Sequence, residues 1–110
     1  MGKLTVTCSD FRPLQRNTLV GFAVVEIAEM QLTIRDVAIH QKGEARWAQL
    51  PAKPQITKDG SVLKDPATGK VQYTTLMDFT SRAVRDAFSA AVIGAVLAYA
   101  PEAFDQERAA

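Results

Sequence analysis

"LTIRDVAIHQKGEARWAQLPAKP", residues 32–54, is the stretch that decides the fold, because its large apolar residues change sides within the first strand-like run. Leu32 and Ile34 lie at even positions, whereas Val37 and Ile39 lie at odd positions. A strand that keeps its apolar side chains on one face can change parity only by inserting an extra residue, which is a β-bulge. The pattern therefore predicts a bulge at Arg35-Asp36, or else a strand half that is covered on both faces. In the first case the two residues form a kink whose polar groups are paired in an ion pair or a turn contact, and no ligand is needed there.

Four strands in a row are expected from this region and the residues before it. Period-two alternation indicates a first strand over residues 3–10, with Pro13 in the turn that follows. A second strand, apolar on both faces and therefore central, extends to about Ile27. The quoted stretch supplies a third strand, a turn at Gly43 and a fourth strand, "RWAQLP", that ends at Pro51. The simplest arrangement of these four strands is an antiparallel meander.

Residues 52–70 have a different composition, because proline and glycine recur every few positions. This composition predicts either a flexible basic loop or a hairpin that turns at Asp59-Gly60. The segment "KVQYTTL", residues 70–76, could form a fifth strand. Loops of this length in small domains are usually functional or disordered.

The clearest helical pattern covers residues 81–100, where Asp78, Thr80 or Ser81 can cap the start and Pro101 stops the helix. From Ala90 onward the pattern is apolar on all sides, and one sheet can cover only one side of such a helix. We therefore expect a homodimer, unless loops of the same chain cover the helix. The predicted fold class is α+β, with one domain over residues 1–110 in which an antiparallel sheet of four to five strands is packed against one long C-terminal helix. The residues expected at the dimer interface are Val92, Ala95, Val96 and Tyr99.

The composition fits one domain in a reducing compartment. The chain has 110 residues, 47% of them hydrophobic, which is enough for a single core. Cys8 is the only cysteine, so an intrachain disulfide and a thiolate zinc site are excluded. The N-terminus lacks the features of a signal peptide, and the longest uncharged apolar run, residues 90–100, is too short to cross a bilayer. We expect a cytoplasmic protein.

Charge is distributed unevenly along the chain. The formal net charge is only +1, so the whole molecule has no strong field that would attract nucleic acid or acidic lipid. Residues 40–70, however, contain six basic and three acidic side chains, a local charge of +3. Residues 101–110 have a local charge of −2 and are expected to form an acidic tail.

No group of residues in the sequence predicts catalysis. His40 has no second histidine and no nearby cysteine as a partner, and a general base needs a positioned partner. Cys8 shares a strand face with Leu4 and Val6, which favours a small core residue over a nucleophile. The aspartates are scattered at turns and element ends, where carboxylates commonly accept backbone hydrogen bonds. We expect no enzymatic activity, no cofactor and no metal ion.

Basic residues and one tryptophan indicate a surface for nucleic acid. Trp47 beside Arg46 and Lys53 suits base stacking with phosphate contact, although a buried anchor is the more common role of tryptophan. The lysines of residues 52–70 either contact the phosphate backbone or only keep the surface solvated. The residues expected to bind nucleic acid are Arg46, Lys53, Lys58, Lys64, Lys70, Arg82 and Arg85.

The order "LTIRDVAI", a short turn, "RWAQLPAK" and a loop leading to a C-terminal helix resembles the SpoVG family of small bacterial regulators. That family has a D-[IV]-R-[VI] strand followed by an F-V-x-M-P-S segment. Asp36, Val37 and Ile39 match the first block with Ala38 in place of arginine, and residues 47–52 match the second block conservatively. The resemblance implies a small antiparallel sheet packed on a long C-terminal helix, dimerisation, and DNA or RNA binding by a basic surface with regulatory consequences. The family's basic positions correspond here to Lys53 and, more loosely, to Arg82 and Arg85.

Two hypotheses for function follow from the sequence. The first is a non-enzymatic, dimeric protein that binds DNA or RNA through a basic loop and sheet surface. The second is a protein-interaction or assembly module, favoured by the near-neutral net charge and the uncharged residues 90–100.

Overall fold

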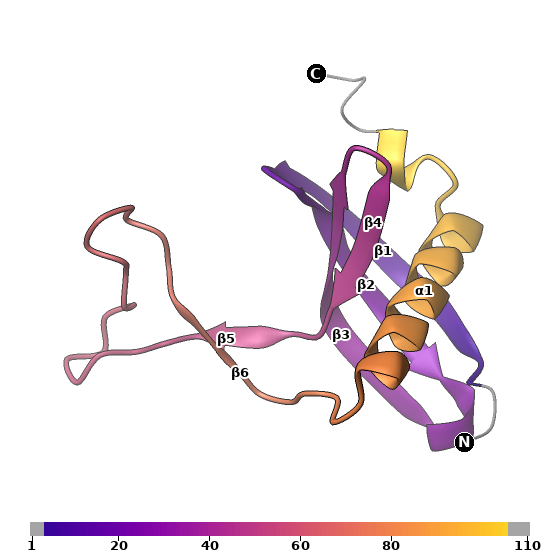
Figure 1. Ribbon diagram of the computed structural model, residues 1–110, viewed down its shortest axis with the longest axis horizontal. Helices are drawn as coiled ribbons and strands as arrows, with labels where there is room; N and C mark the ends of the chain where they lie inside the picture. Colours follow the sequence, from indigo (N-terminus) through magenta and orange to yellow (C-terminus); the bar gives the residue numbers. More distant parts are fainter. Residues whose placement is uncertain (1–3, 106–110) are drawn as a thin grey trace.

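The computed structural model describes residues 4–105 and has an α+β fold, in which one helix covers one face of a four-stranded antiparallel sheet (Figure 1). The strands lie in chain order, so the predicted meander is confirmed. They are β1 (Val6–Arg16), β2 (Leu19–Ile27), β3 (Leu32–Lys42) and β4 (Ala45–Gln49), with a short 3-10 helix, η1 (Ala28–Met30), between β2 and β3. The remaining elements are the strand pair β5 (Ala52–Pro54) and β6 (Tyr73–Thr75) and the helix α1 (Arg82–Tyr99).

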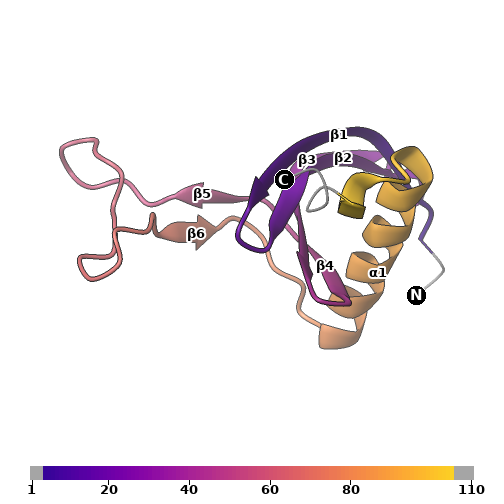
Figure 2. The same ribbon diagram turned by 90° about the horizontal axis from the view of Figure 1, so that it is seen from above.

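The predicted bulge in β3 is present. Two residues of β3, Arg35 and Asp36, lie opposite the single residue Val24 of β2. Asp36 has a left-handed backbone conformation with φ 59°, and aspartate tolerates this region better than most residues do. β1 shifts its register against β2 at the same level, between Cys8 and Asp10. Bulges on both sides of β2 bend the sheet at this level, and Figure 2 shows it curved with α1 on its inner side.

The core lies between the inner face of the sheet and α1. Val25, Val37 and Ile39 of the sheet and Val92 and Val96 of the helix have no solvent exposure. The bulge explains how β3 contributes Ile34 as well as Val37 and Ile39 to this core, because it brings the residues on both sides of the parity change to the same face.

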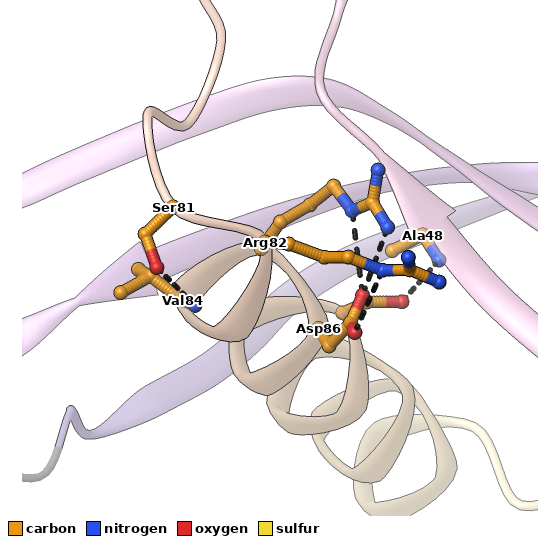
Figure 3. Close-up of polar contacts among 7 residues, drawn as sticks. Ala48, Ser81, Arg82, Val84 and Asp86 are labelled. Carbon is orange, nitrogen blue, oxygen red and sulfur yellow. Dashed lines mark hydrogen bonds and ion pairs between the residues drawn. The ribbon is translucent and has the colours of Figure 1, made fainter.

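The helix begins and ends where the sequence predicts. The Ser81 hydroxyl oxygen accepts a hydrogen bond from the backbone N–H of Val84 at 3.3 Å (Figure 3). Pro101 follows the last turn. The backbone N–H of Ala48 donates to the Ser89 hydroxyl at 2.9 Å (Figure 3). This bond ties the helix to β4, which is an edge strand of the sheet.

β1 is longer than predicted. It continues through Pro13, and the turn follows at Asn17, whose φ is 56°. Proline is tolerated there because β1 is an edge strand, on which a residue without an N–H need not break a ladder. Gly21 on β2 is required by the close approach of β1, since a Cβ atom would lie 2.4 Å from the Arg12 carbonyl oxygen and 2.7 Å from the Phe11 ring.

Residues 52–75 form an arm that projects away from the sheet and helix (Figures 1 and 2). β5 and β6 pair at its root in a separate two-stranded sheet, so the expected fifth strand belongs to the arm and not to the main sheet. Two turns follow, at Gly60 and Gly69, both with positive φ. The carboxylates of Asp59 and Asp65 shape these turns by accepting backbone N–H groups. The segment is therefore a branched hairpin, the second of the two structures that the sequence allowed.

The C-terminal segment packs into the core, which corrects the expectation of an acidic tail from residue 101. Ala103 and Phe104 are each only 4% exposed. The Arg46 guanidinium carbon lies 4.4 Å from the centre of the Phe104 ring, and the Gln41 side-chain amide donates to the Phe104 carbonyl oxygen at 3.2 Å. The rest of the expected tail, residues 106–110, lies outside the described residues.

Candidate nucleic-acid interface

A groove of about 1150 Å³ is lined by the root of the arm, by the outward face of the sheet, which is turned away from α1, and by residues at the start of α1 that include Phe88. Its floor includes Leu19 and Phe22 of β2, which pair with His40 and Ala38 of β3. Side chains alternate along a strand, so these residues point away from the core residues between them. From the sheet the groove extends past the end of β4 to the start of α1, where Arg85 lines it.

A stacked pair of rings borders this floor. The rings of His40 and Trp47 lie 5.3 Å apart and are parallel to within 7°, and the Thr18 hydroxyl lies 3.0 Å from Nδ1 of His40. Burial lowers the pKa of His40, and this effect exceeds the opposing effect of a hydrogen bond from the imidazole to Gln49, so the neutral imidazole is favoured. Trp47 is half-buried on an edge strand and supports His40, so it is not the deep anchor of the sheet.

The arm supplies the second wall of the groove. Ala52, Pro54, Tyr73 and Thr75 line it, whereas Lys53 points to the other side of the ribbon because side chains alternate along a strand. Tyr73 is 59% exposed, so its ring is available to a ligand. The arm therefore adds an aromatic wall to the sheet floor, with its nearest lysine on the opposite side.

Arg12 and Asp36 face each other across β2 at the edge of the groove. The Arg12 Nη2 atom lies 2.5 Å from Oδ1 of Asp36, and the Arg12 guanidinium carbon lies 6.0 Å from the centre of the Phe22 ring. Of the two polar contacts that the sequence allows at the kink, the ion pair is present, and its cation is Arg12 of β1. Sequence reasoning did not select Arg12 or Phe22. The alternation of β1 continues beyond residue 10 and would have identified Arg12, but Pro13 favours a turn there and the predicted strand ends at residue 10.

The lysines expected to bind nucleic acid lie along the arm and are all exposed. Among residues 4–105 none of them takes part in an ion pair. The arm's two acidic residues are used in its turns: hydrogen bonds from Thr57 and Ser61 lower the pKa of Asp59, and Asp65 accepts the N–H groups of residues 67 and 68. The lysine charges are therefore available to phosphate groups. The four residues are Lys53, Lys58, Lys64 and Lys70.

The three arginines of the expected interface have other partners. Arg82 and Arg85 share one carboxylate, that of Asp86, at 3.9 Å and 3.2 Å (Figure 3). Only Arg85 also lines the groove. Arg46 lies over the Phe104 ring, so it stabilises the C-terminal segment and is not directed at the groove.

The expected dimer surface of α1 is only partly exposed. Val92 and Val96 are fully buried against their own sheet, which corrects their assignment to an interface, whereas Ala95 is half-buried and Tyr99 is 49% exposed. The side of the helix that the chain leaves uncovered has small residues at Ala83, Ala87, Ala90, Gly94 and Ala98. Such residues expose little apolar area, so the argument that this helix requires a partner loses its basis. Five of the large exposed apolar residues lie on the arm and beside it, at Ile56, Val62, Tyr73, Leu76 and Met77, and three more lie on or next to strands of the main sheet, at Leu14, Met30 and Leu32.

The described residues show neither a metal centre nor a membrane-spanning helix. Residues 4–105 contain no group of three or more histidine, cysteine, aspartate or glutamate residues that could hold a metal ion. Within that range no helix is both long and apolar enough to cross a membrane. Cys8 is half-buried beside the core, and burial raises the pKa of its thiol.

No family model, curated protein or solved structure matches this chain. The resemblance to the SpoVG family therefore stays a prediction from the sequence.

Proposed function

We propose that this protein is a non-enzymatic nucleic-acid-binding protein that holds a single strand in the groove and along the arm. The lining of the groove is the observation that best supports this proposal. It contains the rings of Phe22, His40 and Tyr73 together with the side chains of Arg12 and Arg85. Stacking of a base on an aromatic ring is worth about 1–3 kcal/mol and is tolerant of sequence.

A single strand fits this lining better than a duplex. Bases in a duplex are already stacked and paired, so their faces are closed to protein rings, whereas a single strand can splay them out. The Tyr73 ring on the arm and the Phe22 ring on the sheet floor lie on different elements around one groove. Unstacked bases can therefore lie between two sides of the groove.

The arm lysines would hold the phosphates of a strand that leaves the groove. Lys58, Lys64 and Lys70 lie at or beside the two turns of the arm, beyond the root that lines the groove. Each phosphate contact adds affinity that falls with salt concentration. The regulatory role implied by the SpoVG resemblance would depend on this binding.

Two exposed tyrosines provide a matched test of this proposal. Tyr73→Ala removes a ring from the groove, whereas Tyr99→Ala removes a similarly exposed ring from the helix, outside the groove. Fluorescence anisotropy with a labelled single strand should show that Tyr73→Ala weakens binding by about 5- to 150-fold, the equivalent of one stacked base. Tyr99→Ala should bind like the wild type, and the matching duplex should bind more weakly than the single strand. Absence of single-strand binding at low salt, or equal losses in the two variants, would contradict the proposal.

A second candidate function is favoured by the aliphatic residues of the arm. Ile56 and Val62 pair across the arm and are 58% and 41% exposed, and aliphatic side chains do not serve as stacking platforms for bases. An isolated two-stranded ribbon is only marginally stable in water. In this second function the arm binds a protein partner that covers its aliphatic residues. The partner is a second copy of this chain, as the predicted homodimer requires. Sedimentation velocity at micromolar concentration tests this candidate, which a monomer would exclude.

A further inference from the structure

Arg12 and Asp36 form a pair of opposite charges over the middle of the outward face. They belong to β1 and β3, the two neighbours of β2, and the long Arg12 side chain reaches Asp36 across the strand between them. Both line the groove, next to the Phe22 ring of β2. A base stacked on that ring would have its edge beside the pair.

The pair contributes little to the stability of the fold. Its side chains are 62% and 63% exposed, and exposed ion pairs of this kind stabilise proteins only weakly. Asp36 also has a left-handed backbone conformation, which is unfavourable for a residue other than glycine, even though aspartate tolerates it. A stability role therefore does not account for placing these two charges at the groove.

The polar groups of the pair are only partly used within the protein. Arg12 donates to Oδ1 of Asp36, and within residues 4–105 the other carboxylate oxygen accepts no hydrogen bond. A guanidinium group has five N–H donors, so several remain on Arg12 as well. The groove thus presents a free acceptor and free donors side by side.

Guanine is the base whose edges match this arrangement best. It has two adjacent donors, N1–H and N2–H, for a carboxylate, and two adjacent acceptors, O6 and N7, for a guanidinium. In a single strand both edges are open to a protein. No other base combines two adjacent donors for a carboxylate with two adjacent acceptors for a guanidinium, since cytosine, for example, offers O2 and N3 to a guanidinium but only its N4 amino group to a carboxylate.

We propose that the Arg12–Asp36 pair selects guanine in a single strand whose base stacks over Phe22. This inference rests on the proposed function, because it names the base that the same groove prefers. Arg12 donates to the acceptors of the guanine, and Asp36 accepts from its donors. The remaining bases of the strand are held without selection, by stacking and phosphate contacts.

The test compares strands of about 12 nucleotides that contain thymidine only or thymidine with isolated guanines, cytosines or adenines. The wild type should prefer the guanine strand by about tenfold, within the discrimination expected of a bidentate contact. Asp36→Asn, which suits the left-handed backbone equally well, should reduce that preference to less than about twofold and keep the affinity for thymidine. Arg12→Lys keeps the positive charge and should also lose most of the preference, because an ammonium group cannot make the paired contact.

Arg35→Gln is the matched control. It removes a charge from the same bulge, but Arg35 does not line the groove, so the preference for guanine should persist. If the wild type binds all strands equally, or if Asp36→Asn keeps the preference, the inference is overturned while the proposed function stands. If no strand binds at low salt, the proposed function fails, and the inference fails with it. Binding to thymidine shows in the same experiment that each variant is folded.

Discussion

Phe104→Ala tests the finding that the C-terminal segment is part of the core. The Phe104 side chain is 4% exposed, and Phe→Ala substitutions at buried positions cost about 3–5 kcal/mol. The lower end of that range applies, because residues 101–105 follow the last helix and can relax into part of the cavity. The contact of Arg46 with the ring adds about 0.5–1 kcal/mol. We therefore expect the free energy of unfolding to fall by roughly 3–4 kcal/mol, a large fraction of the stability of an ordinary domain.

Urea denaturation followed by circular dichroism measures this loss. Glu102→Gln is the control in the same turn, because the Glu102 side chain is exposed and such substitutions change stability by about 0.5 kcal/mol or less. A loss below about 1 kcal/mol for Phe104→Ala would refute the reasoning. It would mean that the segment is a free acidic tail, as the composition alone predicts.

Three further predictions concern the arm, the histidine and the oligomeric state. On a single strand, the slope of log affinity against log salt should flatten by about 0.7 for each phosphate contact removed. Replacing both Lys58 and Lys64 by glutamine should therefore flatten the slope by about 1.4, whereas Lys42→Gln, outside the arm, should leave the slope unchanged. Equal slopes for the wild type, the double variant and Lys42→Gln would exclude phosphate contacts by Lys58 and Lys64. Burial lowers the pKa of His40, so the unfolded chain binds its proton first as the pH falls. The free energy of unfolding should therefore decrease as the pH falls below about 6.5, towards the lower pKa of the folded state. Between neutral pH and pH 5.5 the urea midpoint should drop less in His40→Gln than in the wild type. An equal drop in both proteins would assign the effect to other groups. If the arm pairs two copies, sedimentation velocity should show a dimer that Ile56→Ser dissociates, and a dimer that survives this change would place the contact elsewhere.

The main features of the fold could be predicted because each one leaves a local pattern in the sequence. The parity change around Arg35 and Asp36 located the bulge, since a buried face cannot switch sides without an extra residue. Ser81 and Pro101 bounded the helix, because capping and helix termination depend on residues next to one another in the chain.

Features that depend on tertiary contacts were not predicted. Nothing near Phe104 in the sequence indicates that its ring fills the core, because its partners on β3 and β4 lie far away in the chain. An apolar pattern on all sides of a helix cannot show which side meets the sheet, so Val92 and Val96 were assigned to the wrong surface.

The candidate site was predicted in part. The arm lysines were identified from composition, and their exposure fits the expected role. The groove was not predicted, because it is formed by residues from separate strands and from the root of the arm. Pro13 concealed Arg12 in particular, since a proline on an edge strand gives the same local pattern as a proline in a turn.

Mapping of backbone amide chemical shifts by NMR during titration with a thymidine-rich single strand tests the central claim most directly. Binding in the groove predicts the largest shifts at Phe22, His40 and Tyr73, with smaller shifts along the arm and none at Ala90 or Gly94 on the uncovered side of the helix. Shifts concentrated on that side of the helix, or no shifts at low salt, would contradict the claim that the groove holds the strand.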